Sequence, residues 1–517
     1  MRHTFLFIFP AICLSDIFTA TSNIEELIAA NSANNFRISE YINRETARLN
    51  ELKRLAKEFT RQHQVIISGS DKANPIKTYL LIRSLTSDWN SVERLMKNNS
   101  VDYFLRKNIT KQNFEITYPK AEDLEGAALA LHRLQDTYLL DTHQFASGII
   151  LGESTGFRLT SHDCFEIGKI AYNRGDHYHA ILWMNESLNL LETGNSSSAS
   201  TEDILEHLSF SLYKQGNIER ALYFAQDLLK INPEHPRIKE NIRWYQEWLG
   251  TKSVNQLTFP PLKLKRLEDD VPDRSVYEAL CRGDYEDNST RQSRLYCYLK
   301  RDRPFLRIAP IKVEILNFGP LVVIFRSVIS DSEINVIQRL AAPQLRRATV
   351  QNAKTGALEY AKFRISKSAW LHENNNPLIK NINERIDFMT NLDQKTSEDL
   401  QRDVANPYNL NMGNRIATVL FYVCAYSVLI FTVEKGGKTV FITENLTVYP
   451  SRNDALFWYN LRRDGEADLR TLHAACPVLL GTKWVCNKWI HERGQEFRRP
   501  CGLYRNSEEK YVGDLDS

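Results

Sequence analysis

The sequence predicts a multidomain chain whose first half is helical and whose second half is α+β. Its 517 residues exceed what one hydrophobic core usually organises, so two to four domains are expected. Residues 23 to about 145 read as helical, and residues 160–250 hold an internal repeat. Short β-rich runs begin near residue 310. The predicted fold class is an N-terminal helical domain, a tetratricopeptide-like helical domain and a C-terminal antiparallel jelly roll.

The composition is that of an ordinary folded protein, with 43% hydrophobic and 25% charged residues. A net charge of +3 does not indicate a nucleic-acid partner. The apolar run at 424–433 is far shorter than the roughly 20 residues that span a bilayer. We therefore expect neither a nucleic-acid partner nor a membrane span.

The N-terminus predicts a secretory signal peptide over residues 1–20. A weakly basic start precedes an apolar run at 4–14, and small and polar residues follow. The alternative is a short membrane anchor, although the run is about half of the roughly 20 residues required. Six glycosylation sequons agree with passage through the endoplasmic reticulum lumen, and they begin at Asn98, Asn108, Asn185, Asn195, Asn288 and Asn445.

The segment 38–59 predicts an amphipathic helix. Its apolar residues follow a spacing of three and four, with charged residues in the gaps. These apolar residues are Ile38, Ile42, Leu49, Leu52, Ala56 and Phe59. The pattern fits either an ordinary bundle helix or a dimerisation helix, and the run is too short to secure a long coiled coil.

The internal repeat in residues 160–250 is a tetratricopeptide-like pattern. Tyr172, Gly175 and Ala180 recur as Tyr213, Gly216 and Ala221, an offset of 41 residues. Each unit reads as helix, glycine turn, helix. Stacked units of this kind form a concave face that binds a peptide, the alternative being a purely structural helical pair.

Aromatic residues accompany the repeat and suit a stiff polyproline II ligand. Any one ring could instead pack between the helices. The aromatic residues are Tyr172, Tyr178, Phe210, Tyr213, Trp244 and Tyr245.

Residues 251–308 read as a charged linker that contains Cys281 and Cys297, which we expect to bridge a small loop. Seven cysteines remain once Cys13 leaves with the signal, so at least one is free or pairs with another chain. β-rich runs then follow at 312–316, 321–325, 415–423, 439–442, 447–449, 455–459 and 483–490.

The densest chemical signal lies between the last two predicted strands. His473 and Lys483 are ten residues apart, and Pro477 and Gly481 indicate a turn between them. An imidazole can ligate iron, and a lysine ammonium can hold a carboxylate as a point charge. From chemistry alone, a surface or core histidine is the competing interpretation.

These residues carry a family resemblance. The run from His473 to Cys501 is very similar to the end of collagen prolyl 4-hydroxylase alpha subunits, and further matches lie at 133–138, 163–168, 365–371, 413–418 and 457–461. The resemblance implies a dioxygenase that uses Fe(II), 2-oxoglutarate and L-ascorbate to hydroxylate proline in X-Pro-Gly repeats of procollagen or another proline-rich chain. It also implies a double-stranded β-helix and an α₂β₂ assembly in the endoplasmic reticulum lumen, with protein disulfide isomerase as beta subunit.

The same resemblance assigns domains and residues. It implies a signal peptide at 1–20, a helical N-terminal domain at 21–145, a peptide-binding domain at 146–250, a linker at 251–308, the dioxygenase domain at 309–505 and a tail at 506–517. His473 matches an iron-binding histidine, and Lys483 matches the lysine that binds 2-oxoglutarate. Matching peptide-binding positions are Phe210, Tyr213, Arg237, Asn241 and Trp244. The implied disulfides are Cys281–Cys297 and Cys476–Cys501, with Cys164 unpaired.

The chain departs from the family at the metal site. The family carries its other two iron ligands in a His-x-Asp pair, but only 407–412 stand where that segment belongs, and no histidine lies between His372 and His473. An apolar insertion at 424–432 follows. Two hypotheses result: an active hydroxylase subunit, or a catalytically inactive form that binds proline-rich peptides and assembles. The run around His473 and Lys483 argues against a third, a tetratricopeptide scaffold unrelated to collagen.

Overall fold

The computed structural model describes residues 24–68, 89–97, 121–154, 158–193, 200–250, 259–267, 273–285, 293–347, 350–351, 358–359, 366–398, 413–423, 435–480, 483–502, 504 and 512. The predicted signal peptide lies outside these residues, as do the predicted deletion at 407–412, the predicted insertion at 424–432 and the tail 506–517 apart from Val512. The chain divides into two compact units, residues 22–120 and the remainder.

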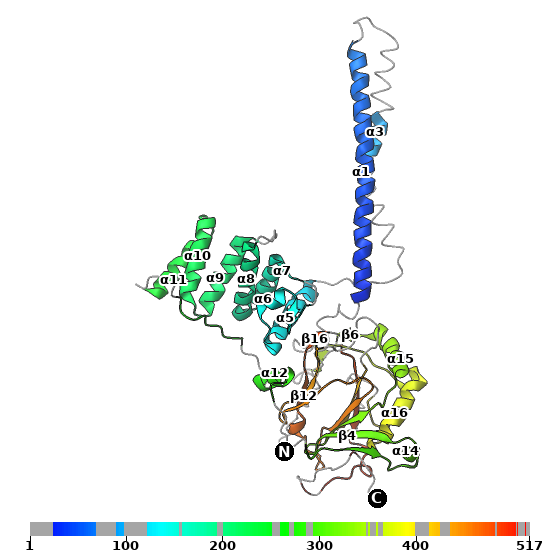
Figure 1. The fold of residues 1–517 in the computed structure, drawn as a ribbon. Coiled ribbons are helices and arrows are strands. Elements are labelled where there is room, and N and C mark those ends of the chain that lie inside the picture. Colours follow the sequence, from blue (N-terminus) through cyan, green and yellow to red (C-terminus); the bar gives the residue numbers. More distant parts are fainter. Residues whose placement is uncertain are drawn as a thin grey trace. The chain divides into compact units, whose positions relative to one another are not determined.

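The smaller unit contains a long helix, α1 (Ile24–Ser68), and a short one, α3 (Trp89–Lys97). Ion pairs three and four residues apart support α1, among them Arg54–Glu51 at 2.7 Å. The rings of Phe59 and Trp89 meet edge to face at 6.4 Å, so α3 lies against α1 (Figure 1). The predicted helix over 38–59 is confirmed as part of α1; a role in dimerisation stays a prediction.

The larger unit begins with a row of helices. These are α5 (Ala121–Tyr138), α6 (Thr142–Ala146), α7 (Ser161–Asn173), α8 (His177–Glu192), α9 (Thr201–Lys214), α10 (Ile218–Ile231) and α11 (Ile238–Leu249). A small hairpin, β1 (Ile149–Ile150) with β2 (Glu153–Ser154), lies between α6 and α7. The predicted repeat is confirmed as two helix pairs, α7–α8 and α9–α10. Gly175 and Gly216 turn the chain within each pair at φ +77° and +78°, a conformation that favours glycine.

The C-terminal part is built on a six-stranded antiparallel sheet of order β17-β10-β14-β5-β4-β3. Its strands are β3 (Cys297–Lys300), β4 (Ile311–Asn317), β5 (Val322–Arg326), β10 (Arg415–Tyr422), β14 (Ala455–Tyr459) and β17 (Val485–His491). A smaller sheet contains β13 (Leu446–Val448), β12 (Thr439–Phe441) and β15 (His473–Ala475), and β11 (Lys435–Gly436) pairs with β16 (Val478–Leu480). The seven predicted strands are thus confirmed to within two residues at each end.

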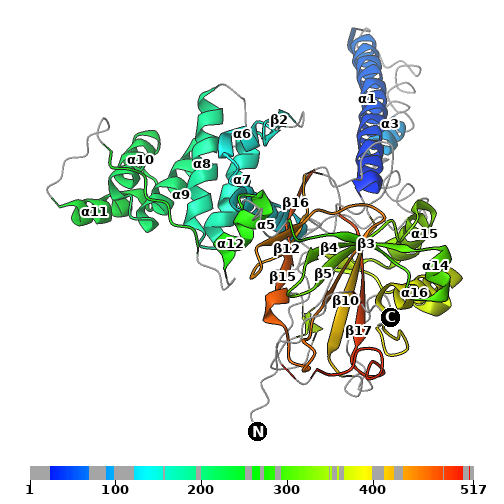
Figure 2. The same ribbon diagram turned by 60° about the horizontal axis from the view of Figure 1, so that its bottom comes forward.

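The two faces of the large sheet serve different cores, because successive strand residues point to opposite sides. On one face, Val323 and Phe325 pack under α15 (Asp331–Ala341) and α16 (Pro377–Thr390). On the other face, Ile324 and Leu420 meet Phe441 of the small sheet. Figure 2 shows this layering, with helices on one side of the large sheet and β12 and β15 on the other.

The remaining elements are short. They are α12 (Arg274–Arg282), α14 (Pro304–Ile308), β6 (Arg346–Arg347), β7 (Val350–Gln351), β8 (Leu358–Glu359) and β9 (Lys367–Ser368), with 3₁₀ turns at Ala342–Gln344, Glu373–Asn375 and Leu469–Thr471. The strands among them form small antiparallel pairs, β6 with β9 and β7 with β8.

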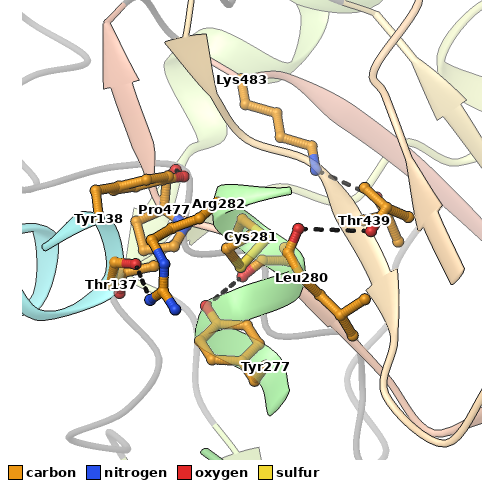
Figure 3. The surroundings of a disulfide bond; sticks show 12 residues. Thr137, Tyr138, Tyr277, Leu280, Cys281, Arg282, Thr439, Pro477 and Lys483 are labelled. Atoms are coloured by element: carbon orange, nitrogen blue, oxygen red, sulfur yellow. Dashed lines mark hydrogen bonds between the residues drawn. A yellow bond between two sulfur atoms is a disulfide. The ribbon is translucent and has the colours of Figure 1, made fainter. Parts of the chain in front are cut away.

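The disulfide pairings that the resemblance implied are wrong in this structure. Cys281 is bonded to Cys476, while Cys297 and Cys501 are exposed free thiols. The reason is packing: α12 lies against β12 and β13, so Cys281 and Cys476 share one buried cluster. Cys297 instead begins the edge strand β3. Cys164 is a buried free thiol, as expected. Figure 3 shows the bond and its surroundings.

Candidate functional site

His473 lies on β15, in the layer between the two sheets. It pairs with Phe441 of β12, and its ring contacts the ring of Trp458 on β14 at 4.6 Å between centroids. Nδ1 lies 2.8 Å from the carbonyl oxygen of Thr471, which can only accept, so Nδ1 carries the proton. Burial lowers the pKa of His473 to about 4. The ring is therefore neutral near pH 7, and Nε2 is the nitrogen that can bind a metal.

Lys483 lies in the same layer and is only 3% exposed (Figure 3). Its ammonium donates to Oγ1 of Thr439 at 3.4 Å and lies 5.7 Å from the ring centroid of Tyr422. The hydroxyls of Tyr422 and Thr439 are 3.1 Å apart. A buried ammonium bordered by two hydroxyls offers charge-assisted and neutral hydrogen bonds of the kind that bind a ligand carboxylate.

Tyr422 and Thr439 did not emerge as site residues from sequence reasoning. Tyr422 ends β10 and Thr439 begins β12, so strands from the two facing layers bring them to Lys483. The alternation of side chains between the two faces of each strand is the sequence signal that could have identified them. Tyr422 falls on the same face of β10 as Leu420, and Thr439 falls on the opposite face of β12 from Val440.

A small polar group holds Trp458 in place beside His473. The indole Nε1 of Trp458 donates to Oδ1 of Asn460 at 2.9 Å, and the amide of Asn460 donates to Thr418 at 2.9 Å. All three side chains are buried. Fully hydrogen-bonded buried groups of this kind keep a ring orientation fixed.

The residues around His473 do not make a complete iron site of two histidines and one carboxylate. Within the described ranges, no group of three possible metal ligands includes His473. The sequence offers no other histidine from residue 373 to residue 472. Among the described residues, His473 is therefore not accompanied by the further ligands that an iron site of this kind needs.

The helical repeats bring the predicted peptide-binding aromatics together. Tyr172 of α7 lies 5.7 Å from Phe210 of α9 between ring centroids, and Phe210 lies 6.2 Å from Tyr213. Tyr213 in turn lies 5.1 Å from Tyr245 of α11. His207 joins this row with its ring 4.6 Å from that of Tyr172, a contact that the sequence did not indicate. The rings form one continuous aromatic row across three helices.

The other three predicted peptide residues lie at α11. Arg237 is its N-cap and forms an ion pair with Glu206 at 2.5 Å while its side chain stays 70% exposed. Asn241 is half-buried, and Trp244 is 52% exposed. Arg237 and Trp244 therefore present exposed polar and aromatic groups on the helical repeats. Their part in peptide binding stays a prediction.

No helix in the described ranges is long and apolar enough to cross a membrane.

Comparisons with known proteins match most of the chain. Residues 20–152 match the family "Prolyl 4-Hydroxylase alpha-subunit, N-terminal region", residues 161–251 match "Prolyl 4-hydroxylase peptide-substrate-binding domain", and residues 390–491 match "2OG-Fe(II) oxygenase superfamily".

Two relatives come from Caenorhabditis elegans. The chain is 50% identical to prolyl 4-hydroxylase subunit alpha-2, covering 97% of this chain and 96% of that protein. It is 43% identical to subunit alpha-1, covering 97% and 93%. The human subunit alpha-1 is 38% identical, covering 94% and 95%. A crystal structure of a viral collagen prolyl hydroxylase from Paramecium bursaria Chlorella virus-1 is 21% identical over 33% of this chain and 95% of that one, with a TM-score of 0.23, too low to carry an argument.

Proposed function

Because the chain belongs to the prolyl 4-hydroxylase alpha-subunit family, we propose that it is the subunit that binds proline-rich procollagen-type peptides and 2-oxoglutarate for proline 4-hydroxylation. The observation that carries the proposal is the buried cluster formed by the ammonium of Lys483 and the hydroxyls of Thr439 and Tyr422. This cluster lies in the same layer as His473. The superfamily works with Fe(II) and 2-oxoglutarate, and we include L-ascorbate as the reductant.

The chain's own residues have separate tasks in this proposal. The ammonium of Lys483 holds the distal carboxylate of 2-oxoglutarate, and the hydroxyls of Thr439 and Tyr422 orient that carboxylate by hydrogen bonds. Burial keeps His473 neutral, so its Nε2 can act as a ligand. The half-buried rings of Tyr172, Phe210 and Tyr213 hold the peptide, because flat rings pack well on the stiff polyproline II backbone. Tyr245 is buried in the helical core and supports Tyr213 from there.

The wider setting is part of the same proposal. We propose that the two facing sheets form a double-stranded β-helix, and that the sequence departs from the family's at 407–412 and 424–432. The alpha-subunit names of the relatives support a beta-subunit partner, which we propose to be protein disulfide isomerase in an α₂β₂ assembly. The signal-peptide pattern and the sequons favour the endoplasmic reticulum lumen. The proposed domain boundaries lie at residues 20, 145, 250, 308 and 505.

A second candidate function is a catalytically inactive subunit that still binds peptides and assembles. The observation that favours it is the absence of any histidine from residue 373 to residue 472, because one histidine alone holds iron weakly. The aromatic row of the helical repeats and the cluster around Lys483 do not depend on the missing histidine.

Hydroxylation of a Pro-Pro-Gly repeat peptide by the chain co-expressed with protein disulfide isomerase separates the candidates. Peptide-dependent turnover of 2-oxoglutarate, with 4-hydroxyproline as product, supports the active subunit. Binding of the peptide and of 2-oxoglutarate without turnover supports the inactive one. Binding of neither contradicts both.

The 2-oxoglutarate site has its own test by calorimetry. Lys483→Ala should weaken 2-oxoglutarate binding tenfold or more, because a charge-assisted hydrogen bond contributes about 1.5–3 kcal/mol. Lys380→Ala is the matched control, since Lys380 lies on α16 with a 67% exposed side chain. Equal affinities for the two variants would place the carboxylate elsewhere.

A further inference from the structure

Two histidines and an aspartate gather in the helical part of the chain, far in sequence from His473. His132 lies on α5, whereas Asp176 is the N-cap of α8 and His179 lies in its first turn. One ligand atom from each lies within 4.8 Å of those of the other two. Within the described ranges, this is the one such group of three. The proposed function uses none of these residues.

His132 is the member whose position needs a ligand to explain it. It is only 4% exposed, and apart from a backbone contact with Ile167 neither ring nitrogen has a hydrogen-bond partner. Its ring stacks on that of His179, with 4.5 Å between centroids and 18° between the ring planes, so one of the two rings must turn for both to bind the same ion. Buried polar groups are nearly always hydrogen-bonded, so an unpartnered imidazole here is costly.

His179 already has the surroundings of a metal-bound histidine. Its Nδ1 lies 2.7 Å from Oδ2 of Asp176, and its Nε2 lies 3.2 Å from Oδ1 of Asp136. A histidine ligand typically gives one nitrogen to the metal and donates with the other to a carboxylate, which fixes the ring. Asp136 is the carboxylate that faces Nε2, although this pair lacks ordinary hydrogen-bond geometry. It can take the outer position while Nδ1, beside Asp176, binds the ion.

The arginines near the cluster are already paired with other carboxylates, so the charge of Asp176 is available to a cation. Arg266 and Arg274 both reach Asp136, at 2.9 Å and 3.0 Å, and both also pair with Glu278. These two guanidiniums and two carboxylates balance one another. The carboxylate of Asp176 lies outside that network, and its hydrogen-bonded partner is His179.

We propose that His132, Asp176 and His179 bind a divalent transition-metal ion, with Zn²⁺ the ion that this donor set fits best. Two imidazole nitrogens and one carboxylate oxygen are an established zinc set, and a water molecule completes four ligands. The ion binds to Nδ1 of His179 and releases to solvent the proton that Nδ1 otherwise shares with Asp176. It would cross-link α5 to α8 and so fasten α5 to the helical repeats.

A competing interpretation needs no metal. Burial opposes the charged form of His179, but hydrogen bonds to Asp136 and Asp176 outweigh burial and raise the pKa of His179 to about 9. A proton would then occupy the place of the ion, and His132 would act as a stacked neutral ring. The two interpretations differ in whether His132 affects metal binding.

Cobalt absorption and zinc calorimetry on the untagged, full-length mature chain, with any subunit that co-purifies, test the proposal. One Co²⁺ per chain should give visible bands without a thiolate charge-transfer band, and Zn²⁺ should displace it. His132→Leu should weaken Zn²⁺ binding about tenfold or more. His162→Leu is the matched control, because His162 is exposed on neighbouring α7.

Asp176→Asn is a second variant that preserves the fold, since asparagine caps a helix as well as aspartate does. It should also lose Zn²⁺ affinity about tenfold or more. Absence of Zn²⁺ binding by the wild type would overturn the proposal. So would cobalt bands that persist unchanged in both His132→Leu and Asp176→Asn. If His132→Leu fails to fold, Asp176→Asn decides alone.

Discussion

At the scale of single residues, burial determines the protonation of His473. The unfolded chain binds a proton at this imidazole below pH 6.5, whereas the folded chain does so only near pH 4. Between these values the unfolded state binds more protons, so the free energy of unfolding falls as the pH falls through this window. The contribution is fully present above pH 6.5 and is lost by about pH 4.

We therefore expect His473→Gln to reduce acid sensitivity. Between neutral pH and about pH 5, protonation linked to His473 should lower the free energy of unfolding of the wild type by about 2 kcal/mol. The variant should not lose this contribution. Urea unfolding at about pH 7.5 and about pH 5, followed by tryptophan fluorescence, measures both differences. An identical loss of unfolding free energy in wild type and variant would contradict the assignment.

The same layer shows what residue patterns can predict. His473 and Lys483 were identifiable because they lie in one short run that resembles a known family. Tyr422 and Thr439 were not, because their proximity to Lys483 arises from strands separated in sequence that face each other across two layers. The cluster of His132 and His179 is hidden for the same reason, since 46 intervening residues separate two packed helices.

At the scale of elements, α9 supplies the middle of the aromatic row. Tyr213 contacts both Phe210 on its own helix and Tyr245 on α11.

Tyr213→Ala should weaken binding of a proline-rich peptide by about 1–2 kcal/mol, because buried aromatic anchors dominate binding energy. Fluorescence titration measures the affinity. Tyr223→Ala on α10 is the matched control, since Tyr223 packs on Phe224 and Phe259 instead; an equal loss there would indicate a general folding effect.

The cysteine pairing is also decided by elements. Cys281→Ser should lower the free energy of unfolding by about 2–5 kcal/mol, because it removes a long covalent cross-link. Cys297→Ser should have little effect, since Cys297 is exposed and free. Non-reducing peptide mapping should recover Cys281 joined to Cys476. A Cys281–Cys297 peptide would instead favour the pairing implied by family resemblance.

Sequence proximity suggested the other pairing, and tertiary packing explains the difference. Cys281 and Cys297 are close along the chain, but α12 carries the first into a buried cluster while β3 carries the second to an exposed sheet edge. Strand and helix positions were predictable because they depend on local periodicity. The partner of a cysteine depends on how those elements pack, which periodicity does not contain.

At the scale of the whole larger unit, three distant segments meet beside the disulfide. The hydroxyl of Tyr138, at the end of α5, donates to the carbonyl of Pro477 at 2.5 Å (Figure 3). Gly436 of β11 lies against both groups. A Cβ at Gly436 would approach the Pro477 oxygen at 2.5 Å and the Tyr138 hydroxyl at 2.7 Å. This junction joins the helical row to the small sheets.

Gly436→Ala should therefore destabilise the chain more than backbone strain alone. Gly152→Ala is the matched control, because Gly152 has nearly the same φ, +83° against +82°, but a Cβ added there would meet nothing within 4 Å. Both changes cost about 1 kcal/mol in strain, and Gly436→Ala should cost about 1–3 kcal/mol more. Thermal unfolding compares the two, and equal melting temperatures would show that the junction can relax.

The bond between Cys281 and Cys476 also governs how the chain would respond to pulling. It closes a covalent ring over a sequence separation of 195 residues. β3, β4, β5, β10 and β14 all lie inside the ring, while β17 lies outside it and, among the described strands, pairs with β10 alone. Tension applied between the termini would bypass the enclosed strands, so within the large sheet it would act on β17. Reduction would release a further contour length of about 650 Å or more. The disulfide thus shields most of the large sheet from tension between the termini and leaves β17 as the strand of that sheet that bears it.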